Sequence, residues 1–308
     1  MNAHQYRTSS LSAEPRRPGD GPASGAKAEN NMKLHEFVPP ILISLLRKLQ
    51  DKPTGAQFYS SYAEALSACH GGYEETQLIR TVYEKTRIYR DSLASQTPRV
   101  FDLSSLRTLV GLSLVVTDRE LNVLDFGGAC GAHYFIARAC MGDRVRFRWH
   151  VIETSKMAAV AKGLEDDQLQ FFDSLPRGKE ALEKIDLVFS SGALQYVPDP
   201  YETLGEMTQC GATALFLTRI GVTRHHVELI TIQTSTLSTN GPGALPEGMP
   251  DGPVKCPVTF ARKDKVEDII EKSYSLDIRF DEDKQAYVAG NTGIDMYGYF
   301  ATLRKDCT

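Results

Sequence analysis

Short apolar runs alternate with segments of helical periodicity across the middle of the chain. The runs have the length of buried strands and occur at residues 121–126, 147–152, 169–172, 185–190 and 214–218. The helical segments between them cover residues 132–141, 155–163, 177–184 and 201–210. Strands that alternate with helices at this spacing predict a parallel sheet with right-handed crossover connections.

The C-terminal region follows a different pattern. Tyr274–Phe280 and Met296–Arg304 alternate between apolar and polar residues as strands do, and no helical segment separates them. We therefore expect an antiparallel strand pair that closes the sheet. The predicted fold class is α/β, with a mostly parallel Rossmann-like sheet and a helical cap at the N-terminal side.

The region before this sheet is predicted to have two parts. Residues 1–31 are rich in Pro, Gly, Ser and charge, and they bury too little apolar surface to offset their ordering entropy, so a disordered tail is expected. Residues 32–120 are interpreted as the helical cap, with helices over 58–96 and 101–115, ahead of a ligand-binding domain at 121–308.

The cap helices carry apolar residues that need to be covered: Leu78, Ile79, Val82, Leu106, Leu109 and Leu112. They are expected to wall a ligand site at the carboxyl edge of the sheet. The alternative is that they pad one face of the sheet.

Composition and charge argue against several kinds of binding partner and cofactor. The formal net charge of -4 gives no electrostatic reason to expect nucleic acid. The six cysteines form no CxxC pair and have no histidines at metal-ligand spacing, so no metal site is predicted. Residues 1–30 lack a signal-peptide core and no stretch reaches the ~20 apolar residues of a membrane span, so a cytoplasmic setting is expected. The apolar segment 37–49 is interpreted as a docked helix, with a helix at a membrane surface as the alternative.

The segment Val123–Gly131 carries the strongest chemical signal. It reads as a buried strand that ends at Asp125, followed by a glycine-rich loop that opens onto the helix at 132–141. Glycines at 127, 128 and 131 allow the backbone to approach a ligand closely. Cys130 is interpreted as a small residue where the backbone turns.

Two ligand classes use a loop of this kind. A dinucleotide site needs G-x-G-x-x-G, and here Ala129 stands at the second glycine position counted from Gly127, and Cys130 at that position counted from Gly128. The carboxylate of Asp125 also disfavours a pyrophosphate. S-adenosylmethionine carries a cationic amine and a sulfonium and no phosphate, so an acid at this place favours it. The loop therefore predicts S-adenosylmethionine as the cofactor.

Further contacts are expected at the ends of neighbouring strands. Glu153 follows the second strand, where a carboxylate can accept hydrogen bonds from both ribose hydroxyls. Phe172 and Asp173 end the third strand, where they are expected at the adenine unless Asp173 is only a solvated turn residue. Ser191 ends the fourth strand, beside the methyl group. The predicted cofactor-binding set is Asp125, Gly127, Gly128, Ala129, Cys130, Gly131, Glu153, Phe172, Asp173 and Ser191.

The acceptor side gives weaker signals. Tyr196, His225 and His226 follow strands or lie in loops, and together with His133 they are candidates for a general base. Arg219 follows the fifth strand and is interpreted either as a ligand of an anionic acceptor or as half of a structural ion pair.

Several motifs together resemble a family of methyltransferases associated with surface-polysaccharide gene clusters. The resemblance spans residues 40–304 and is carried by Gly72-Tyr73, Arg90–Ser92, Val123–Gly128, Ser191–Pro200, Leu217–Arg219 and Thr231–Gln233. The chain departs from the family at Ala129–Ala132 and in a Gly/Pro-rich insertion at 236–254, whose role stays open. The resemblance implies methyl transfer and does not name the acceptor.

The sequence thus predicts a methyltransferase that acts on a small-molecule or sugar acceptor. Two alternatives stay open: a catalytically inactive module that binds the cofactor, and a nicotinamide-dependent oxidoreductase. The sequence leaves the oligomeric state and the methylated atom open.

Overall fold

The structure is a computed structural model that describes residues 57–69, 72–117, 119–223, 227–282, 287–289 and 292–305. The predicted tail at 1–31, the segment at 37–49 and the candidate bases His225 and His226 lie outside these residues. No helix within the described ranges is long and apolar enough to cross a membrane.

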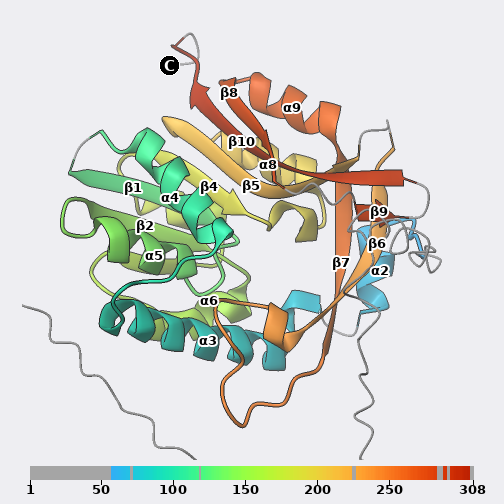
Figure 1. Ribbon diagram of the computed structural model, residues 1–308. Helices are drawn as coiled ribbons and strands as arrows, with labels where there is room; N and C mark the ends of the chain where they lie inside the picture. The colour runs from blue at the N-terminus through green and yellow to red at the C-terminus, as the bar shows by residue number, and fades with distance from the viewer. Residues whose placement is uncertain are drawn as a thin grey trace, which may run out of the picture. The chain divides into compact units, whose positions relative to one another are not determined.

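A single twisted sheet organises the described chain (Figure 1). Its main path follows the order β3-β2-β1-β4-β5-β10-β8. The strands are β1 (Glu120–Phe126), β2 (Arg146–Ile152), β3 (Leu169–Phe172), β4 (Leu187–Ser191), β5 (Ala214–Thr223), β8 (Tyr274–Asp281), β9 (Tyr287–Ala289) and β10 (Thr292–Leu303). The first five are mutually parallel, while β10 runs antiparallel between β5 and β8. The predicted fold class, including the C-terminal antiparallel pair, is confirmed.

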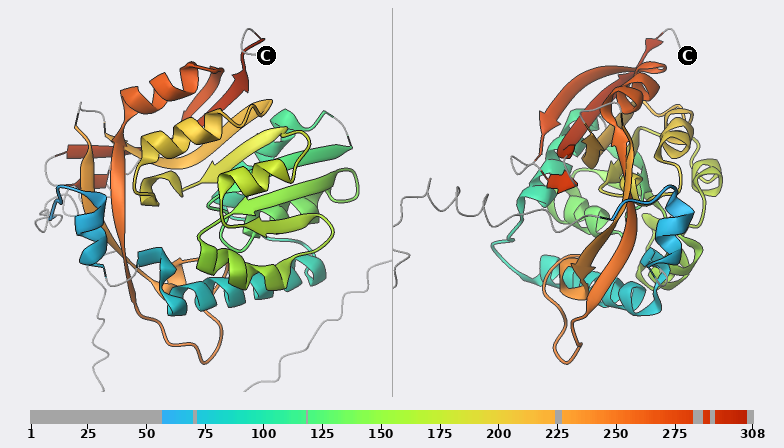
Figure 2. Two further views of the ribbon diagram at one scale, coloured as in Figure 1. Left: turned by 180° about the vertical axis from the view of Figure 1, so that it is seen from behind. Right: turned by 90° about the vertical axis from the view of Figure 1, so that its right-hand side faces the viewer.

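Helices cover both faces of the sheet (Figures 1 and 2). One face carries α4 (Leu103–Val115), α5 (Ala132–Met141) and α6 (Ser155–Ala161), whose buried side chains share one apolar cluster with the strands. The opposite face carries α7 (Leu175–Glu180), α8 (Pro200–Thr208) and α9 (Lys263–Glu271) over a second cluster. The helix expected at 177–184 begins and ends earlier, because Ser174 and Pro176 start it, and α9 is an element that the sequence interpretation omitted.

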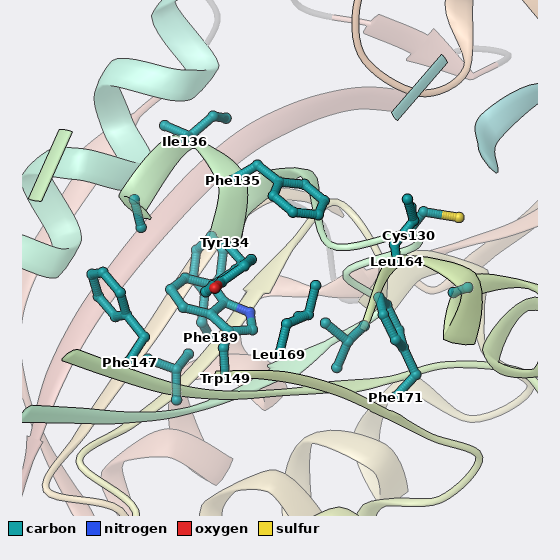
Figure 3. Packing of buried hydrophobic residues seen from close by; sticks show 14 of the residues in the cluster. Cys130, Tyr134, Phe135, Ile136, Phe147, Trp149, Leu164, Leu169, Phe171 and Phe189 are labelled. Carbon is teal, nitrogen blue, oxygen red and sulfur yellow. The ribbon is translucent and has the colours of Figure 1, made fainter. Parts of the chain in front are cut away.

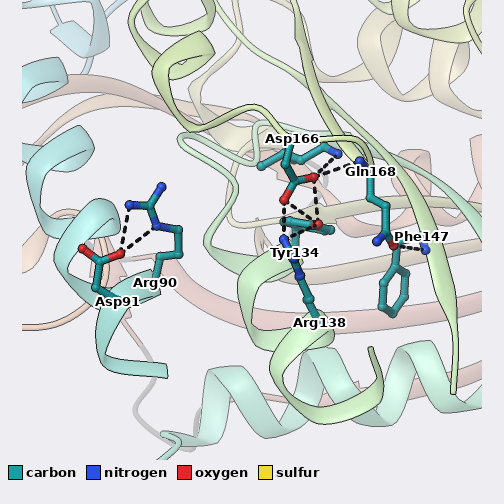
Figure 4. Close-up of polar contacts among 8 residues, drawn as sticks. Arg90, Asp91, Tyr134, Arg138, Phe147, Asp166 and Gln168 are labelled. Atoms are coloured by element: carbon teal, nitrogen blue, oxygen red, sulfur yellow. Dashed lines mark hydrogen bonds and ion pairs between the residues drawn. The ribbon is translucent and has the colours of Figure 1, made fainter. Parts of the chain in front are cut away.

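Aromatic side chains fill the first cluster. Tyr134, Phe147 and Trp149 are fully buried and meet edge to face, with ring centroids 5.9–6.3 Å apart (Figure 3). The Tyr134 hydroxyl leaves the cluster and donates to the carboxylate of Asp166 at 2.9 Å, and Arg138 pairs with the same carboxylate (Figure 4). These contacts fix α5, and therefore the glycine-rich loop before it, on strands β2 and β3.

The helical stretch expected at 58–96 consists of three elements. They are α2 (Tyr62–Ser67), the 3-10 turn η2 (Gly72–Glu74) and α3 (Thr76–Ser95). Leu78, Ile79 and Val82 of α3 are buried in the first cluster, whereas Leu106 of α4 is 47% exposed, contrary to the expectation that it is covered.

A long hairpin stands across the carboxyl ends of the parallel strands (Figure 1). Its strands are β6 (Leu229–Thr236) and β7 (Pro253–Arg262), which pair antiparallel over the whole length of β6. The end of β7 also pairs with the end of β5, at Val222–Ala261. The insertion at 236–254 is the connection between β6 and β7, and it begins with the turn η5 (Leu237–Thr239). The sequence interpretation did not identify this hairpin.

Candidate active site

A cavity of about 740 Å³ lies at the carboxyl ends of the parallel strands. The loop after β1 and the ends of β2, β4 and β5 form one side of it. Residues of α3, the start of α4 and the β6–β7 connection also line it, as do residues of α5, α6, α7 and α8. Open α/β sheets bind ligands at this edge. Of the predicted cofactor-binding set, six residues line the cavity: Gly127, Gly128, Ala129, Glu153, Asp173 and Ser191.

The loop after β1 has a backbone that depends on its small residues. Gly127 has a φ of 69°, and a Cβ there would lie 2.1 Å from the Cβ of Ala193. A Cβ on Gly128 would lie 2.4 Å from Oδ2 of Asp125. Ala129 adopts a φ of 51°, in the left-handed region that favours glycine. The loop therefore passes very close to β4 on one side and to Asp125 on the other.

The carboxylate of Asp125 lies beneath this loop and does not itself line the cavity. It is fully buried, and its Oδ2 accepts a hydrogen bond from Nε1 of Trp149 at 3.1 Å and faces Nδ1 of His133 at 3.3 Å. Its Oδ1 has no hydrogen-bond partner within the described structure. A buried acceptor without a partner is costly unless a ligand or water serves it.

Glu153 connects the end of β2 to the glycine-rich loop. Its Oε1 accepts from the Ala129 amide at 2.9 Å, and its Oε2 accepts from the Thr154 amide at 3.0 Å. Burial raises the pKa of Glu153 from 4.5 to about 7, although the two amides lower it in part. Because a carboxylate oxygen has two lone pairs, each oxygen keeps acceptor capacity toward the cavity.

The other predicted cofactor residues have varied surroundings. Asp173 lines the cavity and pairs with Arg177 at 2.8 Å. Ser191 accepts a hydrogen bond from the Thr218 hydroxyl at 2.8 Å. The ring of Phe172 packs against His150, with centroids 4.7 Å apart, and Phe172 is not among the described residues that line the cavity.

Two residues of the loop point away from the cavity. Cys130 is fully buried in the first apolar cluster, with Sγ 3.6 Å from Sδ of Met157, and burial raises the pKa of its thiol to about 12. Gly131, at a φ of 81°, is the N-cap of α5.

Two candidate bases line the cavity. Tyr196 is half-buried, and its hydroxyl donates to the side chain of Gln233 on β6. Burial raises the pKa of Tyr196, and the nearby charge of Arg219 opposes this shift only in part. A phenol with a raised pKa stays protonated at neutral pH and serves better as a hydrogen-bond donor than as a base. His133 lines the cavity with Nδ1 toward Asp125.

Several lining residues were missed by the sequence interpretation. Tyr73 and Asp102 come from the cap, and residues 239–243 come from the β6–β7 connection. The Gly241-Pro242-Gly243 turn is visible in the sequence, but nothing local indicates that it reaches a site more than 100 positions away. Among the described lining residues, four carry carboxylates, Asp102, Glu153, Asp173 and Glu206, against one Lys or Arg, which is Arg219. Within the described ranges, no group of three His, Cys, Asp or Glu side chains is placed to hold a metal ion.

No protein-family model matches the chain, and no curated protein matches it. Solved structures with a similar arrangement include an S-adenosylmethionine-dependent methyltransferase from Clostridium acetobutylicum, at 10% identity and a TM-score of 0.42 over 72% of this chain and 98% of that one. The N-terminal domain of EvdMO1, in the presence of SAH and D-fucose, matches at 11% identity and a TM-score of 0.42 over 71% of this chain and 97% of that one. The CcbJ methyltransferase from Streptomyces caelestis matches at 12% identity and a TM-score of 0.40 over 69% of this chain and 98% of that one.

Proposed function

We propose that the chain is an S-adenosylmethionine-dependent methyltransferase that acts on a small-molecule or sugar acceptor. The observation that carries this proposal is the joint placement of the loop at 127–129, Glu153, Asp173 and Ser191 on one cavity at the carboxyl edge of the sheet. The resemblance of the sequence to methyltransferases of surface-polysaccharide gene clusters supports methyl transfer and does not name the acceptor.

The hydrogen bonds of the loop argue against a dinucleotide. A pyrophosphate is bound by free backbone N–H groups at such a turn. Here the Gly127 amide donates to the Ile152 carbonyl at 2.9 Å, the Ala129 amide donates to Glu153, and the Gly131 amide donates to the Gly128 carbonyl at 2.9 Å. These three amides are already used within the protein, and a carboxylate faces the loop from below.

The same residues fit S-adenosylmethionine. The partnerless Oδ1 of Asp125 and the acidic lining of the cavity favour a ligand with a cationic amine and a cationic sulfur. Glu153 would hold the ribose hydroxyls, and Gly127 and Gly128 would let the backbone lie close to the ligand. When bound, this cofactor supplies a methyl group on a positively charged sulfur, and the thioether left behind is neutral.

The protein's own contribution is then mainly one of position. No residue is needed to protonate a neutral leaving group, so holding the acceptor in line can supply up to ~7–11 kcal/mol of the barrier. Tyr73, Tyr196 and the connection at 239–243 line the same cavity, where they would contact the acceptor. His133, oriented by Asp125, is the group best placed to take a proton from a hydroxyl acceptor.

Binding of S-adenosylhomocysteine is the first expected result. At a ligand concentration 100 times the dissociation constant, the free energy of unfolding should rise by ~2.7 kcal/mol, which thermal denaturation with and without ligand measures. NADH is the matched control and should leave the melting temperature unchanged. A folded protein that is stabilised by NADH and not by S-adenosylhomocysteine would contradict the proposal.

The pH dependence of binding tests the role of Glu153. Its pKa of about 7 in the unliganded protein means that the carboxylate protonates as the pH falls below that value. A protonated acid accepts hydrogen bonds poorly, so the affinity for S-adenosylhomocysteine should be constant above pH about 8 and fall below about 7. Calorimetric titrations at several pH values measure this.

Substitution of Glu153 by Gln should remove that pH dependence. It should also weaken binding at pH 8 by ~1.5–3 kcal/mol, or roughly 10- to 150-fold, the range for hydrogen bonds to a charged group. Glu84→Gln, on the outer side of α3 in an ion pair with Arg87, is the matched control and should bind as the unsubstituted protein does. Equal affinities for Glu153→Gln and the control would remove Glu153 from the site.

A further inference from the structure

Arg219 breaks the regularity of β5. Nine of the ten residues of β5 are buried, and Arg219 is the exposed one. Its φ of 56° is left-handed, which is uncommon for a residue with a side chain. The pairing of β5 with β10 shifts here, so that Thr218 and Arg219 together face Gly298 alone. Such a bulge re-aims a side chain, and bulges of this kind are frequent beside active sites.

The bulge is held in place by a buried carboxylate. The Arg219 amide donates to Oε1 of Glu282 at 2.6 Å, and the other oxygen of Glu282 pairs with Arg107. The Glu282 side chain is only 2% exposed. Both of its oxygens are therefore engaged by groups other than the Arg219 guanidinium. A strained backbone that persists with such support is a reason to look for a function.

The guanidinium of Arg219 lies flat against Gly192 at the end of β4. A Cβ on Gly192 would meet Nη2 at 2.7 Å and Nε at 2.8 Å, so only glycine leaves room for this arrangement. Arg219 is the one Lys or Arg among the described residues that line the cavity. No hydrogen bond or ion pair joins its guanidinium to another described residue, so its N–H donors are not engaged within the described structure.

Two phenols and one carboxylate lie near this cation. Tyr73 and Tyr196 pack edge to face with ring centroids 4.8 Å apart, and both line the cavity. Burial raises the pKa of each phenol, and the charge of Arg219 acts on both. The nearby carboxylate of Asp102 is engaged as the N-cap of α4, where it accepts from the Ser105 amide at 2.7 Å.

We propose that Arg219 binds an anionic group of the acceptor, a carboxylate or a phosphate. The assignment rests on the proposed methyltransferase function. A planar guanidinium matches both anions with two parallel hydrogen bonds. Arg219 lies on β5, three strands from the ribose ligand Glu153 on β2, which is about 14 Å at the usual strand spacing. This places it on the acceptor side, beyond the methyl group.

Calorimetry and NMR spectroscopy together test the proposal. Affinity for S-adenosylhomocysteine is measured for the unsubstituted protein, Arg219→Gln, Arg219→Lys and the control Arg148→Gln, whose arginine lies outside the cavity and pairs with Glu120. The protein saturated with S-adenosylhomocysteine is then titrated with acetate and with inorganic phosphate at fixed ionic strength. The arginine Nε–Hε signals are followed, and that of Arg219 is assigned by its absence from the Arg219→Lys spectrum.

The expected result is a saturable shift of the Arg219 signal with one or both anions, while the Arg148 signal does not move. A response to phosphate alone would indicate a phosphorylated acceptor. A response to acetate would indicate an acceptor that carries a carboxylate. All four proteins should bind S-adenosylhomocysteine equally. The titration uses the unsubstituted protein, so its result is valid even if Arg219→Gln folds poorly.

Two outcomes would overturn the inference and leave the proposed function intact. One is an Arg219 signal that does not respond, or responds no more than that of Arg148. The other is a loss of roughly tenfold or more in the affinity of Arg219→Gln for S-adenosylhomocysteine, which would make Arg219 a ligand of the cofactor. Failure of the unsubstituted protein to bind S-adenosylhomocysteine would instead refute the proposed function itself.

Discussion

A chain that begins at Leu121 should fail to fold. We propose that residues 32–120 form a cap, and its helices α3 and α4 contribute five large buried side chains to the core: Leu78, Ile79, Val82, Leu93 and Leu112. At about 1.5–3 kcal/mol each, their loss removes about 8–15 kcal/mol of burial free energy. That range is comparable to the whole stability of a typical domain, about 5–15 kcal/mol. The deletion also uncovers the side chains of α5 and β5 beneath α3 and α4.

The matched comparison is a chain that begins at Met32. Residues 1–31 contain few large apolar side chains, so their removal should leave the melting temperature and the affinity for S-adenosylhomocysteine unchanged. Size-exclusion chromatography and thermal denaturation of both shortened chains measure the difference. A monomeric protein from Leu121 onward that binds S-adenosylhomocysteine normally would show that the cap is a separate domain.

The parallel half of the sheet was predictable because most residues of its central strands are buried, all five of them in β4. Such strands read as continuous apolar runs, and the runs at β1, β2 and β3 agree with the structure within one residue. The helix at 132–141 was predicted with its observed bounds, since Gly131 precedes it and Gly142 follows it. Here local sequence and tertiary structure favour the same conformation.

The β6–β7 hairpin was not predictable on the same grounds. All eight residues of β6 are at least partly exposed, and its polar Thr231–Thr236 stretch has no apolar run to mark a strand. Its connection at 236–254 is tied to α3, where the buried Lys85 donates to the Ser238 carbonyl at 2.6 Å. A contact across more than 150 positions leaves no trace in local periodicity.

Arg219 illustrates what the sequence could not decide. The sequence interpretation left open whether it binds an anion or forms an ion pair, because an ion pair depends on a partner that is distant in sequence. In the structure the carboxylate of Glu282 lies near Arg219, but it accepts from the Arg219 backbone amide and pairs with the side chain of Arg107. The bulge at Arg219 directs the backbone amide, and not the guanidinium, to Glu282 and therefore decides against this ion pair. It arises from the pairing of β5 with β10, about 80 positions later in the chain.

Gly127→Ala should abolish binding of S-adenosylhomocysteine and destabilise the protein. The new Cβ would lie 2.1 Å from the Cβ of Ala193, far inside contact distance, so either the loop or the segment after β4 must move. The left-handed φ of 69° adds a cost of ~1–2 kcal/mol for any residue with a side chain, and the overpacking adds ~1–3 kcal/mol. Chemical denaturation should therefore report a loss of ~2–5 kcal/mol. Binding suffers as well, because the displaced loop carries the Ala129 amide that holds Glu153.

Two further variants separate backbone strain from collision. Gly211 has nearly the same φ, 72°, and no atom lies within 4 Å of a Cβ added there. Gly211→Ala should therefore lose only the stability that the left-handed backbone costs, and it should bind S-adenosylhomocysteine normally. The double variant Gly127→Ala with Ala193→Gly removes the colliding methyl group and should recover most of the difference between the two single variants. If Gly127→Ala and Gly211→Ala lose equal stability and bind equally, the close approach of the loop to Ala193 has no part in forming the site. Recovery in the double variant would instead show that the space between Gly127 and Ala193 sets the loop position from which Glu153 is held.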